Sequence, residues 1–239
     1  MASTFSSDLK LEIVATGEKA GLWGTITNTN LQILEQSASG YIEIDMAGAN
    51  ITLDLTDGST SNGKNFYLKL SGTLAGDRTL TMPSGSERVW IISDETVRGG
   101  SNRTLSVLTA SGTSQPVPPG ATLLCVSDGT NTTTRIIEKG YATITDSNSP
   151  YAAVAGAQIF ANTTANPIEI DLPSSPAVGD EITIIDTRGT FASNNLTIDR
   201  NGQPINTGTS NLVLNTNGQS ITLVYVDATR GWAYKTNTA

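Results

Sequence analysis

Apolar and polar residues alternate in short runs through most of the chain. This alternation is typical of β-strands that bury one face. In the first half the apolar positions of these runs include Ile42, Ile44, Met46, Ile51, Leu53, Leu55, Phe66, Leu68, Leu70, Leu80 and Met82. Loops rich in Gly, Ser, Asn and Asp, such as TDGSTSNGKN at residues 56–65, separate the runs. Short strands joined by such turn residues favour a β-sandwich or a jelly roll.

Residues 1–40 have a different pattern. Their first part alternates in the manner of a strand or an extended arm, and Gly40 ends a stretch with helical spacing that predicts a helix from about Thr25 to Ser37. The apolar residues expected to anchor this segment are Leu9, Leu11, Ile13, Leu22, Trp23, Ile26 and Ile33. A segment of this length cannot form a core alone. It therefore packs on the neighbouring domain or docks into a partner subunit.

The two halves of the chain correspond to each other. RTLTMPSGSERVWIISDETVRGGSNRTLSV, from Arg78, is answered by IEIDLPSSPAVGDEITIIDTRGTFASNNLTI, from Ile168, at an offset of about ninety residues. An offset of this size matches a small domain more than the repeat of a solenoid. We therefore predict an all-β chain with an N-terminal anchoring arm and helix (1–40) and two tandem, related β-sandwich or jelly-roll-like domains (41–139 and 140–239).

Composition and charge narrow the function classes. The net charge is −8 with no basic segment, which argues against a nucleic-acid partner. Cys125 is the one cysteine, so no internal disulfide can form. No apolar run is long enough to predict a membrane span, and the first residues lack the pattern of a signal peptide. We expect a protein made in a cytoplasm and not secreted through a signal peptide.

The residue types present give little support to catalysis. The sequence has no histidine, which excludes Ser-His-Asp and Cys-His nucleophile systems and most zinc sites. Paired acids could still cleave a polysaccharide, and Asp171, Asp180, Glu181 and Asp186 are close in sequence. However, strand neighbours point to opposite faces, and Asp186 and Asp94 hold matching places typical of structural turns. We predict that the chain is not an enzyme.

Some loops contain residues that could bind a ligand. Asp54 and Asp57 before Gly58 could bind a cation, but the loop lacks the spacing and the bidentate Glu of a calcium loop, so a turn is expected and no metal or cofactor is predicted. The distal loops of the second domain are candidates for contact with a glycan. Their residues are Asn201, Gly202, Asp227, Thr229 and Arg230.

Exposed aromatic residues could also bind sugar. Candidates are Tyr41, Tyr141, Tyr151 and Trp232. Trp232 and Tyr234 alternate with Ala233 in the last predicted strand, so they share one face of the strand, and this face is expected to lie in the core. Tyr141 and Tyr151 flank the predicted domain boundary and are expected to pack between domains or subunits.

Two long phrases carry a resemblance to a known group of proteins. TGEKAGLWGTITNTNLQILEQSASGY, with the later VPPGATLLCVSDGTN, resembles N-terminal parts of structural proteins of tailed bacteriophages, particularly marine and cyanobacterial phages. DLPSSPAVGDEITIIDTRGTFASNNLTIDRNGQPI and the segment through Trp232 look like a module of tail fibres and related virion appendages. The matches extend from about Gly17 to Trp232.

The resemblance implies a homotrimeric virion structural protein whose matching stretches are scaffold. The chain lacks the coiled coil or Gly-X-Y shaft of a long fibre. We therefore expect a short fibre or spike-like appendage, attached to the tail or head through its N-terminal segment and bound to copies of itself and to other virion proteins. Alternatives are a capsid decoration (cement) protein and a receptor-binding adhesin that recognises a host surface glycan.

Overall fold

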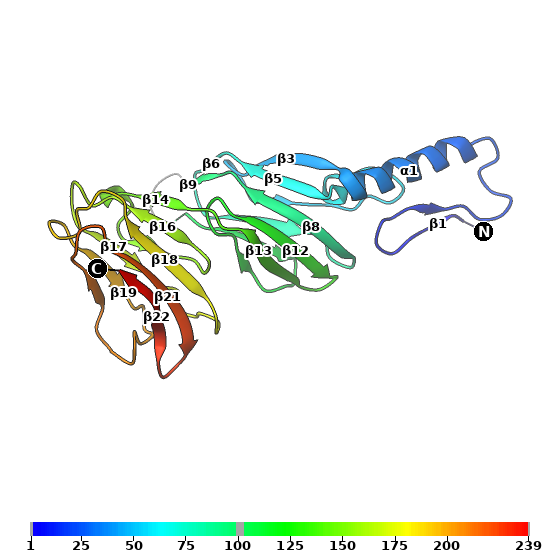
Figure 1. Ribbon diagram of the computed structural model, residues 1–239. Helices are drawn as coiled ribbons and strands as arrows, with labels where there is room; N and C mark the ends of the chain where they lie inside the picture. Colours follow the sequence, from blue (N-terminus) through cyan, green and yellow to red (C-terminus); the bar gives the residue numbers. More distant parts are fainter. Residues whose placement is uncertain (1, 99–102, 239) are drawn as a thin grey trace. The chain divides into compact units, whose positions relative to one another are not determined.

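The computed structural model describes residues 2–98 and 103–238 and divides the chain into two compact units (Figure 1). The first comprises Met1–Thr96, Leu105–Val117 and Thr122–Ile137, and the second comprises Val97–Thr104, Pro118–Ala121 and Glu138–Ala239. Strands dominate both units, and the described residues form one α-helix.

The first unit contains the N-terminal hairpin, the helix and two sheets. The elements in residues 4–64 are β1 (Thr4–Phe5), β2 (Glu12–Ile13), α1 (Trp23–Ser39), β3 (Tyr41–Asp45), β4 (Ile51–Thr52) and the 3-10 helix η1 (Asn62–Lys64). Those in residues 67–94 are β5 (Tyr67–Ser71), β6 (Thr73–Leu74), β7 (Arg78–Met82) and β8 (Glu87–Asp94), and the short strand β9 (Val97–Arg98) that follows falls within the bounds of the second unit. The remaining strands up to residue 138 are β10 (Leu105–Thr109), β11 (Gln115–Pro116), β12 (Thr122–Asp128) and β13 (Thr132–Glu138).

The chain of the first unit passes back and forth between the two sheets. β3, β5 and β8 are parallel neighbours in one sheet, and β4, β7 and β10 are parallel neighbours in the other. Each coil therefore contributes one strand to each sheet. The antiparallel strands β11 and β12 end the stack, and β13 completes the order β13-β12-β8-β5-β3.

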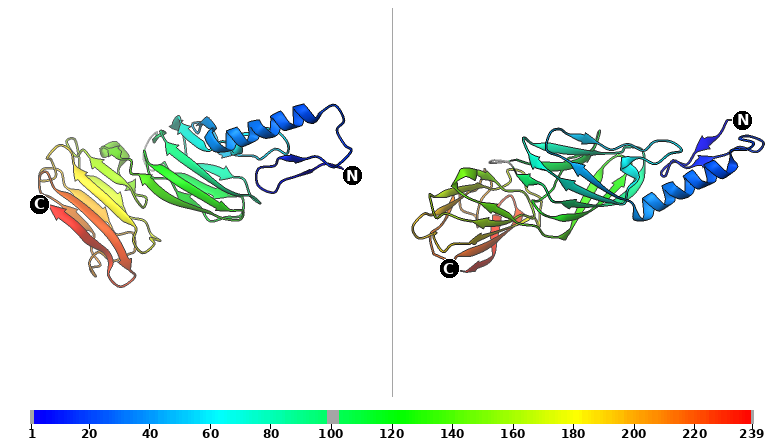
Figure 2. Two further views of the ribbon diagram at one scale, coloured as in Figure 1. Left: turned by 45° about the vertical axis from the view of Figure 1, so that its right-hand side comes forward. Right: turned by 90° about the horizontal axis from the view of Figure 1, so that it is seen from above.

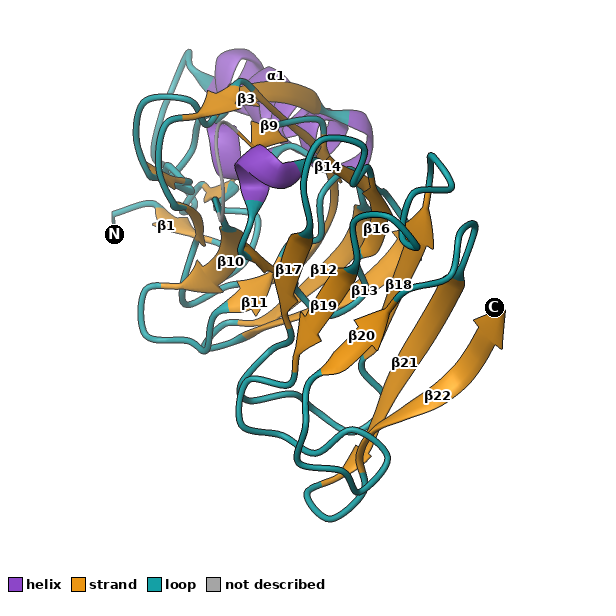
Figure 3. Ribbon diagram, turned by 90° about the vertical axis from the view of Figure 1, so that its left-hand side faces the viewer, coloured by secondary structure: helices purple, strands orange, loops and turns teal. Residues whose placement is uncertain are grey.

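The second unit repeats this path. Its elements are β14 (Ala142–Ile144), the 3-10 helix η2 (Asp146–Asn148), β15 (Tyr151–Ala152), β16 (Gln158–Ala161), β17 (Ile168–Asp171), β18 (Glu181–Asp186), β19 (Leu196–Asp199), β20 (Leu212–Leu214), β21 (Ser220–Asp227) and β22 (Gly231–Thr238). Figure 3 shows β17, β19 and β20 in one sheet and β16, β18, β21 and β22 in the other. Strands β14, β16 and β18 are parallel, as are β15, β17 and β19. Strands β20 and β21 pair antiparallel with β19 and β18, and β22 pairs antiparallel with β21.

The prediction of two β-sandwich or jelly-roll-like domains is wrong, because the strands form a β-solenoid of stacked coils. In the first unit Tyr41, Tyr67 and Ile91 are successive cross-strand partners, 26 and 24 residues apart. These separations lie within the range of solenoid repeats. Apolar alternation identifies a buried face in a solenoid and in a sandwich alike, and it does not identify the neighbouring strand.

Side chains that point between the two sheets form the core of each unit. In the first unit Leu68, Leu70 and Trp90 are fully buried, and the Trp90 indole donates a hydrogen bond to the Gly63 carbonyl at 3.0 Å. In the second unit Ile159, Ile184 and their neighbours form one apolar cluster. Trp232 is buried in this cluster, as predicted, whereas Tyr234, which was expected on the same core face, is 41% exposed.

The helix α1 covers the range predicted from spacing and adds two residues at each end. Gly40 caps its C-terminus, and the Gly40 amide donates to the Gln36 carbonyl at 2.9 Å. A Cβ at Gly40 would lie 2.3 Å from that carbonyl oxygen. The close approach of the backbone, and not a left-handed conformation, therefore requires glycine here.

Candidate functional site

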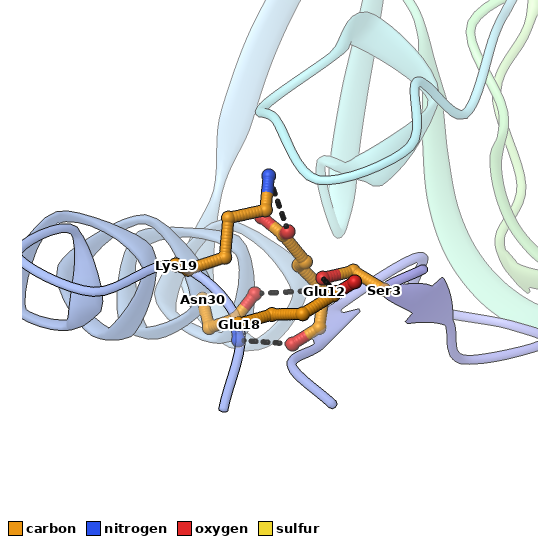
Figure 4. Close-up of polar contacts among 5 residues, drawn as sticks. All are labelled: Ser3, Glu12, Glu18, Lys19 and Asn30. Carbon is orange, nitrogen blue, oxygen red and sulfur yellow. Dashed lines mark hydrogen bonds and ion pairs between the residues drawn. The ribbon is translucent and has the colours of Figure 1, made fainter. Parts of the chain in front are cut away.

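The N-terminal hairpin lies along one side of α1 (Figure 2). The Asn30 side chain fixes it through a two-way bond with Glu12: the Glu12 amide donates to Asn30 Oδ1 and Asn30 Nδ2 donates to the Glu12 carbonyl, both at 3.0 Å. Figure 4 shows this pair together with the Lys19–Glu12 ion pair at 3.2 Å and the Ser3 hydroxyl that donates to Glu18. Polar contacts therefore hold the hairpin against the helix and against the segment that precedes it.

The loop of the hairpin contacts the solenoid of the first unit. The Asp8 carboxylate accepts a hydrogen bond from the Glu87 amide at 3.0 Å, and this bond lowers the pKa of Asp8. The Ser86 hydroxyl donates to the Asp8 carbonyl, and the Gly58 amide donates to the Lys10 carbonyl at 2.8 Å. The arm is therefore joined to the solenoid at both the hairpin loop and the helix.

One side of the helix faces this scaffold. Ile33 is fully buried, the Ser61 amide donates to the Gln36 side chain, and Arg88 donates to the Ser37 hydroxyl. Together with Ile26 and Asn30, these residues occupy adjacent turns of the helix. They form the inner face of α1.

A second set of apolar side chains on α1 points to solvent. Trp23, Leu31 and Leu34 are 66%, 57% and 42% exposed, and Thr27 and Ala38 are exposed as well. Intervals of four, four, three and four residues place all five on one side of the helix. We call these five residues the outer stripe. It contains no charged residue, and Glu35 is the one charged residue in the whole helix.

The predicted anchoring residues divide between the inner side and the surface. Ile33 is buried, whereas Leu9, Leu11 and Ile26 are half-buried. Ile13, Leu22 and Trp23 are more than half exposed. Three further exposed apolar residues of the arm were not predicted from the sequence, namely Phe5, Leu31 and Leu34. The four-residue spacing of Trp23, Thr27 and Leu31 was the signal that could have identified the stripe.

The predicted distal loops of the second unit lie together. The Thr207 amide donates to the Arg230 carbonyl, and the Trp232 amide donates to the Pro204 carbonyl, so the loop after β19 packs on the β21–β22 hairpin. Asn201, Gly202, Asp227, Thr229 and Arg230 are all exposed.

Two of these loop residues hold the turns in place. Asn201 Nδ2 donates to the Leu172 carbonyl at 2.8 Å. Asp227 accepts from the amides of Thr229 and Arg230 at 2.8 and 2.7 Å, and these bonds lower the pKa of its carboxyl. Both side chains therefore have a structural role.

Three of the four carboxylates considered for catalysis have structural partners. Asp186 accepts hydrogen bonds from the amides of Arg188, Gly189, Phe191 and Gly218, which supports the structural role predicted for it. Asp180 accepts from the Ala177 amide, and Glu181 contacts Lys139 and Lys235.

An ammonium group occupies the centre of the loop considered for a cation. Lys64 is fully buried, and its Nζ donates to the carbonyls of Thr56 and Ser59 at 2.6 and 2.5 Å. Burial lowers the pKa of Lys64. Within residues 2–98 and 103–238, no group of three or more Cys, Asp or Glu side chains is placed to bind a metal ion. Across the same ranges, no helix has the length and apolar character needed to cross a membrane.

Comparisons with known proteins leave the family of this chain open. No family model matches the sequence, and no curated protein matches it. Among solved structures, one described as "Structure of a chaperone-substrate complex" aligns with 82% of this chain at 13% identity and a TM-score of 0.35. The chain spans 32% of the length of that protein. A likeness this weak carries no argument about function.

Proposed function

We propose that this chain is a structural subunit of a bacteriophage virion, a short homotrimeric fibre or spike-like appendage that attaches to the particle through its N-terminal arm. One observation carries the proposal. The arm of about 40 residues exposes six large apolar side chains at 40–66%: Phe5, Ile13, Leu22, Trp23, Leu31 and Leu34. The resemblance of the arm and the second unit to virion proteins supports the same assignment.

The outer stripe is suited to packing between copies. The intervals between Thr27, Leu31, Leu34 and Ala38 are those of a helix that packs against other helices along a narrow seam. Covering a side chain such as Leu or Trp contributes roughly 1.5–3 kcal/mol. Three copies around one axis would each contribute the same stripe, while the inner face keeps each helix attached to its own solenoid.

Self-association is tested by sedimentation of the full chain. We expect the wild type to sediment as a trimer and the Leu31→Ser/Leu34→Ser variant as a monomer. Val178→Ser removes a 77% exposed valine outside the arm and serves as the matched control. Circular dichroism should show all three proteins folded. A wild-type monomer at about 0.1 mM, a concentration that would populate even a weak complex, contradicts the trimer.

Location in the particle needs a separate measurement. Mass spectrometry of purified phage particles should detect the chain, and antibodies against it should label one site on the tail or head. Labelling at one attached appendage supports the fibre assignment, whereas labelling dispersed over the head surface supports a decoration protein. Absence of the chain from purified particles contradicts both.

A further inference from the structure

An exposed pair of aromatic rings lies on the outer side of the first solenoid unit. Tyr41 on β3 and Tyr67 on β5 are cross-strand partners, and their ring centroids are 5.6 Å apart with 14° between the ring planes. Tyr41 is 57% exposed. Because β3 is the edge strand of the five-stranded sheet, no strand among the described residues pairs with it on the side away from Tyr67.

The second unit has an equivalent pair. Tyr141, which directly precedes the edge strand β14, stacks on Phe160 of β16 with centroids 4.8 Å apart and 17° between the planes. Tyr141 is 61% exposed. Both tyrosines follow a glycine in the sequence, Gly40 and Gly140, at the start of the first coil of a unit. The same arrangement therefore occurs twice in one chain.

Burial alone does not account for these pairs. A tyrosine that is more than half exposed gives up most of the stabilisation its ring could contribute to a core. Exposed apolar groups that recur at one place are typical of binding surfaces. The ring face left open at the sheet edge can accept one more flat group in the same stack.

Hydrogen-bonding side chains lie next to the rings. Glu43 and Lys69 are two residues beyond Tyr41 and Tyr67 on the same strands, so they share the outer face. Lys69 pairs with Glu43 at 3.6 Å and with Glu95 at 3.1 Å. A row of donors and acceptors thus runs beside the first aromatic pair.

The second pair also has charged neighbours. Lys139 stands two residues before Tyr141 and forms an ion pair with Glu181 at 3.6 Å. Lys235 contacts the same carboxylate. Both units therefore place an aromatic pair next to charged side chains that can form hydrogen bonds with hydroxyl groups.

We propose that the two aromatic pairs, Tyr41–Tyr67 and Tyr141–Phe160, are carbohydrate-binding platforms, each of which takes one pyranose ring of an oligosaccharide. The axial C–H groups of a pyranose form a flat apolar face that packs on an aromatic ring, while its edge carries hydroxyls. The ring faces and the charged row supply both kinds of contact. This proposal is independent of the assembly function, because none of its residues belongs to the arm's outer stripe.

The test is titration of the full chain with cellohexaose, maltohexaose and chitohexaose, followed by calorimetry. We expect binding of at least one of these sugars with a Kd on the order of 0.1–1 mM and two sites per chain. Tyr41→Ala and Tyr141→Ala should each remove one site, and the double variant should weaken binding by about tenfold or more. Tyr41→Phe keeps the aromatic ring, so this variant should retain sugar binding at the first site.

Tyr234→Ala is the matched control, because Tyr234 is an exposed tyrosine of β22 outside both pairs. It should bind sugar as the wild type does. Failure of all three sugars to bind, wild-type binding by the double variant, or equal loss in Tyr234→Ala would overturn the proposal. Sedimentation of the same variants separates the two proposals, since loss of the platforms should leave the oligomer unchanged.

Discussion

Replacement of Asp186 by alanine tests whether one carboxylate organises the end of the second unit. Asp186 is 7% exposed at the end of β18. Its Oδ1 accepts from the amides of Arg188 and Gly189 at 3.1 and 2.9 Å, and its Oδ2 accepts from Phe191 and Gly218 at 3.2 and 3.0 Å. The substitution removes the acceptor for all four amides at once.

The size of the effect follows from how well water can replace the carboxylate. A hydrogen bond to a charged group contributes about 1.5–3 kcal/mol net, and a buried donor left without a partner costs a similar amount. The four bonds are coupled and share two oxygens, so their sum overstates the loss. We expect Asp186→Ala to lower the free energy of unfolding by about 3–5 kcal/mol.

Asp186→Asn is a second variant at the same position, with which the loss of stability in Asp186→Ala can be compared. The amide keeps one acceptor oxygen but presents an NH₂ group to two backbone donors. Asp186→Asn should therefore lower the free energy of unfolding by at least about half as much as Asp186→Ala does. Asp227→Ala is the exposed counterpart, since Asp227 accepts from two turn amides in solvent, and it should cost far less.

Urea unfolding followed by circular dichroism measures the loss, and hydrogen exchange resolved by peptide locates it. Peptides of the second unit should exchange faster in Asp186→Ala, while those of the first unit stay unchanged. A stability within about 1 kcal/mol of the wild type would refute the reasoning, as would an equal loss in Asp227→Ala.

Two further predictions concern titrating groups. Burial raises the pKa of Cys125 to about 12, so the native thiol should not react with Ellman's reagent at mildly alkaline pH and should react fully in denaturant; rapid reaction of the native protein would contradict this. Burial and the neighbouring Asp199 charge raise the pKa of Asp171 above its ordinary value of 3.8, so folding disfavours its carboxylate. Asp171→Asn should therefore be more stable than the wild type at neutral pH, with the difference vanishing below pH 3.8 in urea titrations; an advantage that persists there would contradict this.

Strand positions were predictable because the alternation of apolar and polar residues within a strand indicates which of its side chains are buried. Leu68 and Leu70 alternate with polar residues, and both are fully buried on β5. Strand direction was not predictable in the same way. The neighbour of β3 is β5, and the intervening chain first crosses to β4 in the opposite sheet. Parallel solenoid coils and antiparallel sandwiches produce the same alternation of apolar and polar residues. The alternation therefore could not distinguish the predicted sandwich from the solenoid.

The arm shows a similar limit at the level of one helix. Spacing identified α1 and its apolar residues, but it could not separate residues that contact the protein's own solenoid from residues that face outward. Ile33 and Leu34 are adjacent and both apolar, yet Ile33 is fully buried and Leu34 is 42% exposed. Their difference depends on where the hairpin and the first coil pack, which the helix sequence does not contain.

Local chemistry was enough to define the strands, the helix, the turn residues such as Asp186 and the near absence of charge along α1. The direction of each strand, the aromatic pairs at the sheet edges and the two faces of the helix arose from contacts between segments about 20 or more residues apart. The physical reason is that burial is a property of a neighbourhood in space. A side chain's own identity sets how much it gains from being covered, and the path of the rest of the chain sets whether anything covers it.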